Sequence, residues 1–107
     1  MLLATSNAQG ELSALERGMH ALRSGMEVKA YAESVGRKRT TVHDEVYAAE
    51  VAEAVPHMRN EISDYYRHLT AIHAAPYWLW PHLAPAMLQK HWTVEQILTA
   101  VARLRKA

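Results

Sequence analysis

The sequence predicts an all-α fold, a compact multi-helix domain. Apolar residues recur at helical spacings of three and four along most of the chain, as on one face of a helix. No segment alternates apolar and β-branched or aromatic residues with polar ones as a half-buried strand does. The chain has 107 residues, half of them hydrophobic, which is enough for one core. We therefore expect a single helical domain over residues 8–107, preceded by a frayed N-terminus at residues 1–7.

Three helices are predicted before Pro56. Their apolar stripes consist of Leu12, Leu15, Met19 and Leu22, of Val28, Tyr31, Ala32 and Val35, and of Val42, Val46 and Ala49. The first helix should end at the Ser-Gly-Met segment 24–26 and the second at Gly36, because glycine readily adopts the left-handed conformation that ends helices. Pro56 is expected to break or kink the third helix.

Two further helices are predicted in the second half of the chain. The first stripe, with Ser63 as the expected N-cap, consists of Ile62, Tyr65, Tyr66, Leu69 and Ile72. The last stripe consists of Val94, Ile97, Leu98, Val101 and Leu104. Thr93 with Gln96 three residues later predicts a capping box at its start.

The segment between these two helices is rich in proline and aromatic residues. We expect Pro76, Pro81 and Pro85 to divide it into short pieces. For the aromatic run 77–81 we favour a core position over a base-stacking or partner surface.

Charge is distributed unevenly, although the net charge is only +1. Residues 23–39 carry +3 and residues 40–66 carry −5. This pattern excludes a uniformly basic nucleic-acid-binding coat but leaves a local basic patch at residues 37–39.

No enzyme is predicted. The absence of cysteine excludes disulfides and thiolate metal sites, and the seven histidines include no pair spaced i, i+4. No nucleophile motif or phosphate-binding loop is present. We therefore expect no catalytic residues, no metal and no cofactor. Without an 18-residue apolar run or a leader-like start, we expect a cytoplasmic protein with no membrane contact.

The second and third predicted helices have the spacing of a helix-turn-helix over about 27–54. Ala32 is small where the helices would cross, Gly36 suits the turn, and Val42 supplies the buried aliphatic residue six positions later. Glu45 departs from the pattern, because an aliphatic residue is usual at that position.

A helix-turn-helix would direct the start of its second helix into a DNA major groove. Cations and the helix N-terminus can bind phosphates there. Arg39 could bind guanine, and Thr40 and Thr41 could contact phosphate or a thymine methyl group. The candidate DNA-binding residues are Lys29, Arg37, Lys38, Arg39, Thr40, Thr41, His43, Asp44 and Tyr47. The alternative is a helical protein–protein interaction module that docks a partner on its acidic face (44–64) or its aromatic segment (77–92).

The segment LRSGMEVKAYAESVGRKRTTVHDEVYAAEVAEAV resembles the central DNA-binding domain of the ParB/KorB family of partition proteins. Within it, KRTTV at 38–42 is similar to the opening of the family's recognition helix. YYRHLTAIHA and HWTVEQIL resemble the family's later helices more loosely, and the resemblance extends over roughly residues 7–100.

The resemblance implies binding to a palindromic double-stranded DNA site, in plasmid or chromosome partition or in transcription regulation. It places Arg39, Thr40, Thr41 and His43 on the recognition helix. It also implies a dimer in the full-length protein, a separate partition ATPase as a partner, and a bacterial location with the nucleoid or a plasmid. The family's nucleotide-binding domain and a dimerisation tail are not evident, so we expect an excised middle domain or a reduced relative.

Overall fold

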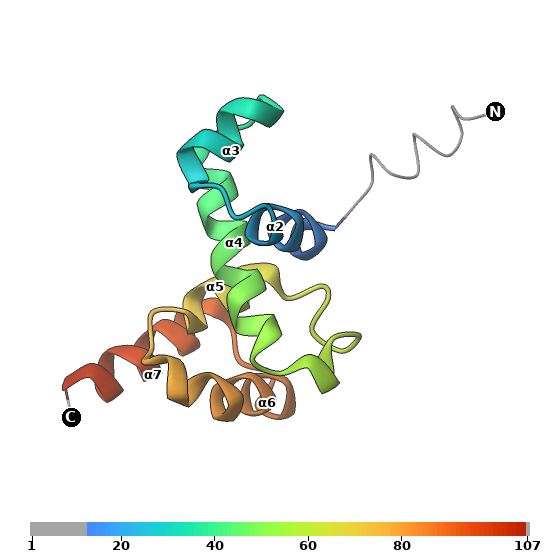
Figure 1. Ribbon diagram of the computed structural model, residues 1–107. Coiled ribbons are helices and arrows are strands. Elements are labelled where there is room, and N and C mark those ends of the chain that lie inside the picture. Colours follow the sequence, from blue (N-terminus) through green and yellow to red (C-terminus); the bar gives the residue numbers. More distant parts are fainter. Residues whose placement is uncertain (1–12, 107) are drawn as a thin grey trace.

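Residues 13–106 are described by the computed structural model, and they form helices, turns and loops with no strand among them (Figure 1). The six α-helices of this part are α2 (Ala14–Arg23), α3 (Val28–Val35), α4 (Arg39–Glu53), α5 (Tyr66–Ile72), α6 (Trp80–Lys90) and α7 (Val94–Lys106). Two 3₁₀ helices, η1 (Pro56–Met58) and η2 (Tyr77–Leu79), lie between them. The all-α prediction is confirmed, whereas the predicted frayed segment 1–7 lies outside the described residues.

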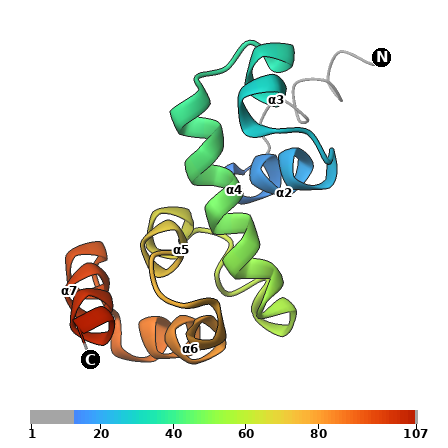
Figure 2. The same cartoon turned by 60° about the vertical axis from the view of Figure 1, so that its left-hand side comes forward.

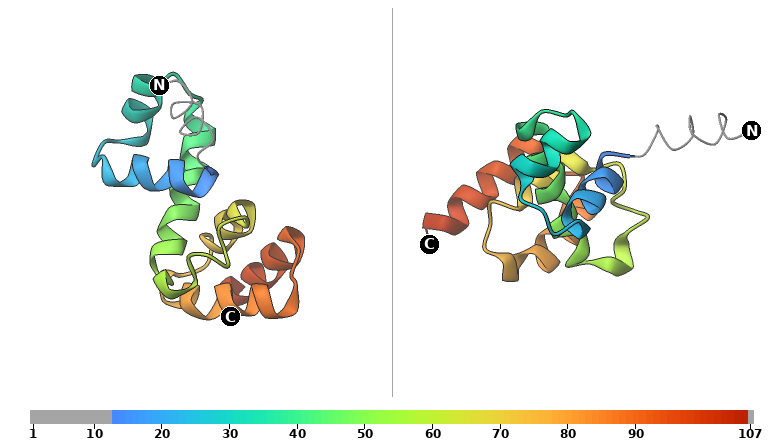
Figure 3. Two further views of the ribbon diagram at one scale, coloured as in Figure 1. Left: turned by 90° about the vertical axis from the view of Figure 1, so that its right-hand side faces the viewer. Right: turned by 45° about the horizontal axis from the view of Figure 1, so that its top comes forward.

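Helix α4 connects the two ends of the domain. Helix α2 crosses its middle, α3 lies beside its N-terminal half, and α5 packs against it further along (Figure 2). Helices α6 and α7 pack on α5 at the end away from α3, and the left view of Figure 3 shows the same separation. The first two turns of α4 therefore lie at the α3 end of an elongated molecule of 52 × 27 × 21 Å.

The close crossing of α2 and α4 depends on Gly18. This residue is buried, and a Cβ atom added to it would collide with the backbone carbonyl of Glu45. Helix α2 is fixed at its start by a capping box that the sequence analysis did not identify. The Ser13 amide donates to Glu16 Oε1 at 3.0 Å, and the Glu16 amide donates to Ser13 Oγ at 3.1 Å.

Helix α3 ends at Gly36, as predicted. Gly36 has a φ of 70° and a ψ of 35°. Its amide donates to the Glu33 carbonyl, and the Arg37 amide donates to the Ala32 carbonyl at 2.9 Å. This pair of bonds is a Schellman motif, which satisfies the last carbonyls of α3 and turns the chain into α4.

Two groups of buried side chains hold the helices together. The larger group joins α2 and the second half of α4 to α5, α6 and α7, through residues such as Leu15, Val51, Leu69 and Ile97. The smaller group, which we call the α3 cluster, consists of Ala21, Ala32, Val42 and Val46. Helix α3 contributes only Ala32 to it as a buried residue.

The capping box predicted at residue 93 is confirmed. The Thr93 amide donates to Gln96 Oε1 at 2.8 Å, and the Gln96 amide donates to Thr93 Oγ1 at 3.2 Å. The predicted N-cap at Ser63 is wrong. Helix α5 begins only at Tyr66, and the Ser63 hydroxyl instead donates to the Asn60 carbonyl at 3.1 Å within the preceding turn.

The predicted break at Pro76 is confirmed, because this proline lies between α5 and η2. The predicted breaks at Pro81 and Pro85 are wrong, because Trp80–Lys90 forms one helix. Pro81 lies in the first turn, where an amide hydrogen has no intrahelical partner, so it is tolerated. Pro85 costs the helix a single backbone bond.

The predicted core position of the aromatic run is wrong for three of its residues, Tyr77, Trp78 and Pro81, which are exposed. Tyr77 is 70% exposed and Trp78 is 63% exposed. Trp80 is half-buried, and its indole N–H donates to the Ala75 carbonyl at 3.0 Å.

Candidate functional site

The start of α4 presents exposed cations and uncapped amides. Lys38, at the N-cap position, has extended backbone, and no side chain accepts from the amides of the first turn. Lys38, Arg39 and Thr40 are all exposed. Because a helix N-terminus carries partial positive charge, the side chains and the backbone both favour an anion here.

Four of the nine candidate residues line one depression. Arg39, Thr40, His43 and Asp44 surround a hollow of about 430 Å³ on the open face of the first two turns of α4. A helix places residues three and four apart on one face, which is why these four meet.

The remaining candidates lie outside this hollow. Thr41 is half-buried, and Lys29 is exposed on α3. Arg37 and Tyr47 each pack against other parts of the protein, as described next.

Glu45 is buried and binds two arginines. Its side chain is 2% exposed, and it accepts from Arg37 Nη1 at 2.7 Å, Arg37 Nη2 at 2.9 Å and Arg17 Nε at 3.1 Å. The bonds from Glu45 raise the pKa of Arg37 above its ordinary value. The polar residue that departs from the helix-turn-helix pattern is thus the centre of an ion network between α2, the turn and α4. This network was not predicted, because it joins residues 8 and 28 positions apart, beyond the reach of local spacing patterns.

Tyr47 packs into the junction between α4 and α5. Its ring stacks on His73, with centroids 3.8 Å apart and planes at 3°, while His43 meets it edge-on at 4.1 Å. His73 Nε2 lies 2.6 Å from Glu50 Oε1, and its ring lies against Trp80 at 4.8 Å. This aromatic column connects the candidate face of α4 to α5 and α6, and it explains why Tyr47 is only half exposed.

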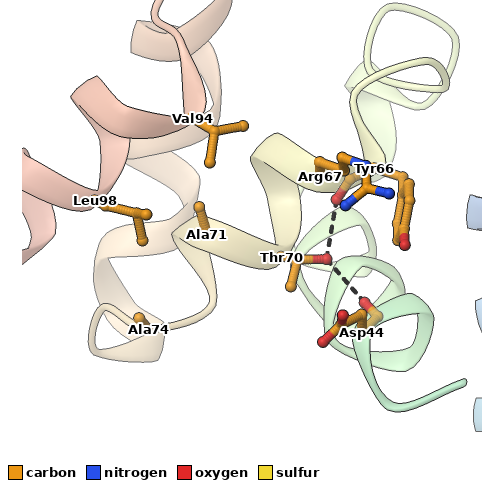
Figure 4. Close-up of a pocket in the computed structure, with 8 residues that line it drawn as sticks. All are labelled: Asp44, Tyr66, Arg67, Thr70, Ala71, Ala74, Val94 and Leu98. Atoms are coloured by element: carbon orange, nitrogen blue, oxygen red, sulfur yellow. Dashed lines mark hydrogen bonds between the residues drawn. The ribbon is translucent and has the colours of Figure 1, made fainter. Parts of the chain in front are cut away.

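Asp44 lines both this hollow and a second, more apolar pocket of about 420 Å³, which Figure 4 shows. The pocket lies between α4, α5 and α7, and its lining includes Tyr66, Ala71, Val94 and Leu98. Leu98 is 49% exposed.

The Thr70 hydroxyl joins α5 to α4 in this region. It donates to the Asp44 carbonyl at 2.8 Å and also lies 3.0 Å from the Tyr66 carbonyl of its own helix (Figure 4). The backbone behind Asp44 is therefore held, while its side chain remains exposed.

Within residues 13–106, no three histidine, aspartate or glutamate side chains gather where they could hold a metal ion. None of the helices described is long and apolar enough to cross a membrane. Comparison of the chain with models of protein families, with curated proteins and with solved structures found no match.

Proposed function

We propose that this protein binds double-stranded DNA site-specifically, with α3 and α4 acting as a helix-turn-helix of the ParB/KorB type. The observation that supports this best is the exposed start of α4, where Lys38, Arg39 and uncapped amides lie beside the hollow. The first two turns of α4 enter the major groove. The helices at the other end of the domain hold α4 in place.

Each residue of the hollow has a role in this proposal. Lys38 and the amides of the first turn bind phosphate. Arg39 forms a bidentate contact with a guanine, and Thr40 contacts phosphate or a thymine methyl group. His43 and Asp44 lie one turn further along the same face and contact base edges; an aspartate accepts from cytosine N4.

The biological role follows from the sequence resemblance alone. It supports a palindromic site bound by two copies, in partition or in transcription regulation. A dimer of the full-length protein and a separate partition ATPase belong to the same proposal.

The proposal predicts that Arg39→Ala weakens binding to the protein's own site by about 1–3 kcal/mol and relaxes base preference at one position. The site is first found by selecting bound duplexes from a random pool, and affinities are then measured by fluorescence anisotropy. Arg105→Ala is the matched control, because it removes an exposed arginine from α7, at the opposite end of the domain. Equal losses in the two variants would contradict the docking of α4.

A second candidate function is a helical protein-interaction module. The exposure of Tyr77 and Trp78 favours it, because large aromatic side chains are enriched at protein interfaces. A titration of the chain with random-sequence duplex DNA, from low to high salt concentration, separates the two functions. No binding at any salt concentration would reject the DNA-binding proposal and favour the interaction module.

A further inference from the structure

The three cations of the turn, Arg37, Lys38 and Arg39, differ in their surroundings. Lys38 and Arg39 are exposed, and neither has an ion-pair partner among the residues that the structure describes. The Arg37 side chain is only 29% exposed, and both of its terminal nitrogens bind Glu45.

Arg37 is also fixed through its backbone. Its amide closes the Schellman motif on the Ala32 carbonyl at 2.9 Å. The residue therefore connects the end of α3, by its backbone, to the middle of α4, by its side chain.

Withdrawing Arg37 from this position would be costly. The Glu45 carboxylate is almost completely buried, and Arg17 would be left as its other partner at 3.1 Å. A buried charge that loses a hydrogen-bonded partner destabilises the fold strongly, so a phosphate does not compete well for Arg37.

We propose that Glu45 determines which cations of the turn reach DNA, by holding Arg37 inside the protein and leaving Lys38 and Arg39 for phosphate and bases. This inference rests on the proposed DNA-binding function and deepens it. Glu45 acts as a positioning residue that fixes the angle of the turn. It also limits sequence-independent affinity, because one of three adjacent cations is neutralised internally.

The test measures affinity for a random-sequence duplex by fluorescence anisotropy over a range of salt concentrations. Each phosphate contact contributes about 0.9 to the slope of log K against log salt. We expect Lys38→Gln to reduce the slope by about 0.9 and Arg37→Gln to reduce it by much less. Glu45→Gln keeps the shape of the side chain but frees Arg37, so the slope should become steeper by about 0.9. This gain should vanish in the Arg37→Gln/Glu45→Gln double variant.

A measurement on the unmodified protein covers the case in which a variant at 37 or 45 does not fold. In nuclear magnetic resonance spectra, the Arg37 guanidinium signals should be slow to exchange and should keep their positions when DNA is added. The Arg39 signals should shift.

The outcomes separate this inference from the function on which it rests. If the wild-type chain fails to bind DNA at any salt concentration, the proposed function is overturned and the inference falls with it. If the chain binds DNA but Arg37→Gln and Lys38→Gln reduce the slope equally, only the inference is overturned. A shift of the Arg37 signals on DNA binding would likewise overturn only the inference.

Discussion

Single residues decide how closely α2 and α4 approach each other. Gly18 packs on the backbone of Glu45, and the carboxylate of the same Glu45 binds Arg17 from α2 and Arg37 from the turn. One position of α4 thus combines a tight backbone contact with a buried ion network. A small shift of α2 would disturb both the packing and the turn at residues 36–38.

Gly18→Ala should destabilise the protein by about 1–3 kcal/mol, because the added methyl group meets the rigid backbone of α4 and the helices must separate. The free energy of unfolding is measured by urea denaturation followed by circular dichroism. His20→Ala, at an exposed position of the same helix, is the control and should stay within about 0.5 kcal/mol of wild type. Equal stabilities of the two variants would rule out the close crossing.

At the scale of single elements, the two capping boxes differ in one useful respect. The box at α2 contains a carboxylate, Glu16, whereas the box at α7 contains the neutral Gln96. The bond from the Ser13 backbone amide, the largest contribution, lowers the pKa of Glu16 from its ordinary value of 4.5. The ionised form is therefore favoured in the folded protein.

The contribution of Glu16 to stability should be fully present above pH 4.5 and should be lost as the pH falls through the lowered pKa. The difference in melting temperature between wild type and Glu16→Gln, determined at pH 7 and at pH 3, measures this contribution. The advantage of wild type at neutral pH should shrink in acid. The effect of Gln96→Ala should not change over the same range, since that box has no charge. A Glu16→Gln deficit that is constant with pH would contradict the ionised cap.

Features of the fold set by neighbouring residues could be predicted from the sequence. The helix end at Gly36 and the cap at Thr93 depend on residues within one turn, and the apolar stripes depend only on spacing. The effect of Pro81 was not predicted, because a proline is tolerated in the first turn of a helix and the start of α6 was not predicted. The N-cap predicted at Ser63 is wrong because the Ser63 hydroxyl binds the nearby Asn60 carbonyl instead.

The candidate site was less accessible to sequence reasoning. The grouping of Arg39, Thr40, His43 and Asp44 on one face follows from helical spacing alone. The internal pairing of Arg37 with Glu45 and the stacking of Tyr47 on His73 depend on contacts between residues 8 and 26 positions apart, which no local pattern reveals. Even so, Glu45 indicated a buried ion pair, because an acidic residue at a core position needs a cationic partner.

At the scale of the whole molecule, the two core groups are unequal. The larger one joins five of the described helices, whereas the α3 cluster has four small or medium residues, Ala21, Ala32, Val42 and Val46. Val35, in the last turn of α3, is 45% exposed. The helix that supports the proposed DNA-binding face is therefore the described α-helix with the fewest buried residues.

We therefore expect α3 to open locally, without unfolding of the rest of the domain. In native-state hydrogen exchange, amides of α3 such as Val35 should exchange with a lower free energy of opening than those of Val51 in α4 and Leu69 in α5. Mild denaturant should speed exchange at Val51 but change it little at Val35, because a local opening exposes little surface. If α3 instead exchanged only with global unfolding, the α3 cluster and the Arg37–Glu45 pair would hold it as firmly as the larger core does.

Added DNA should slow exchange in α3, since binding to the closed form raises the free energy of opening.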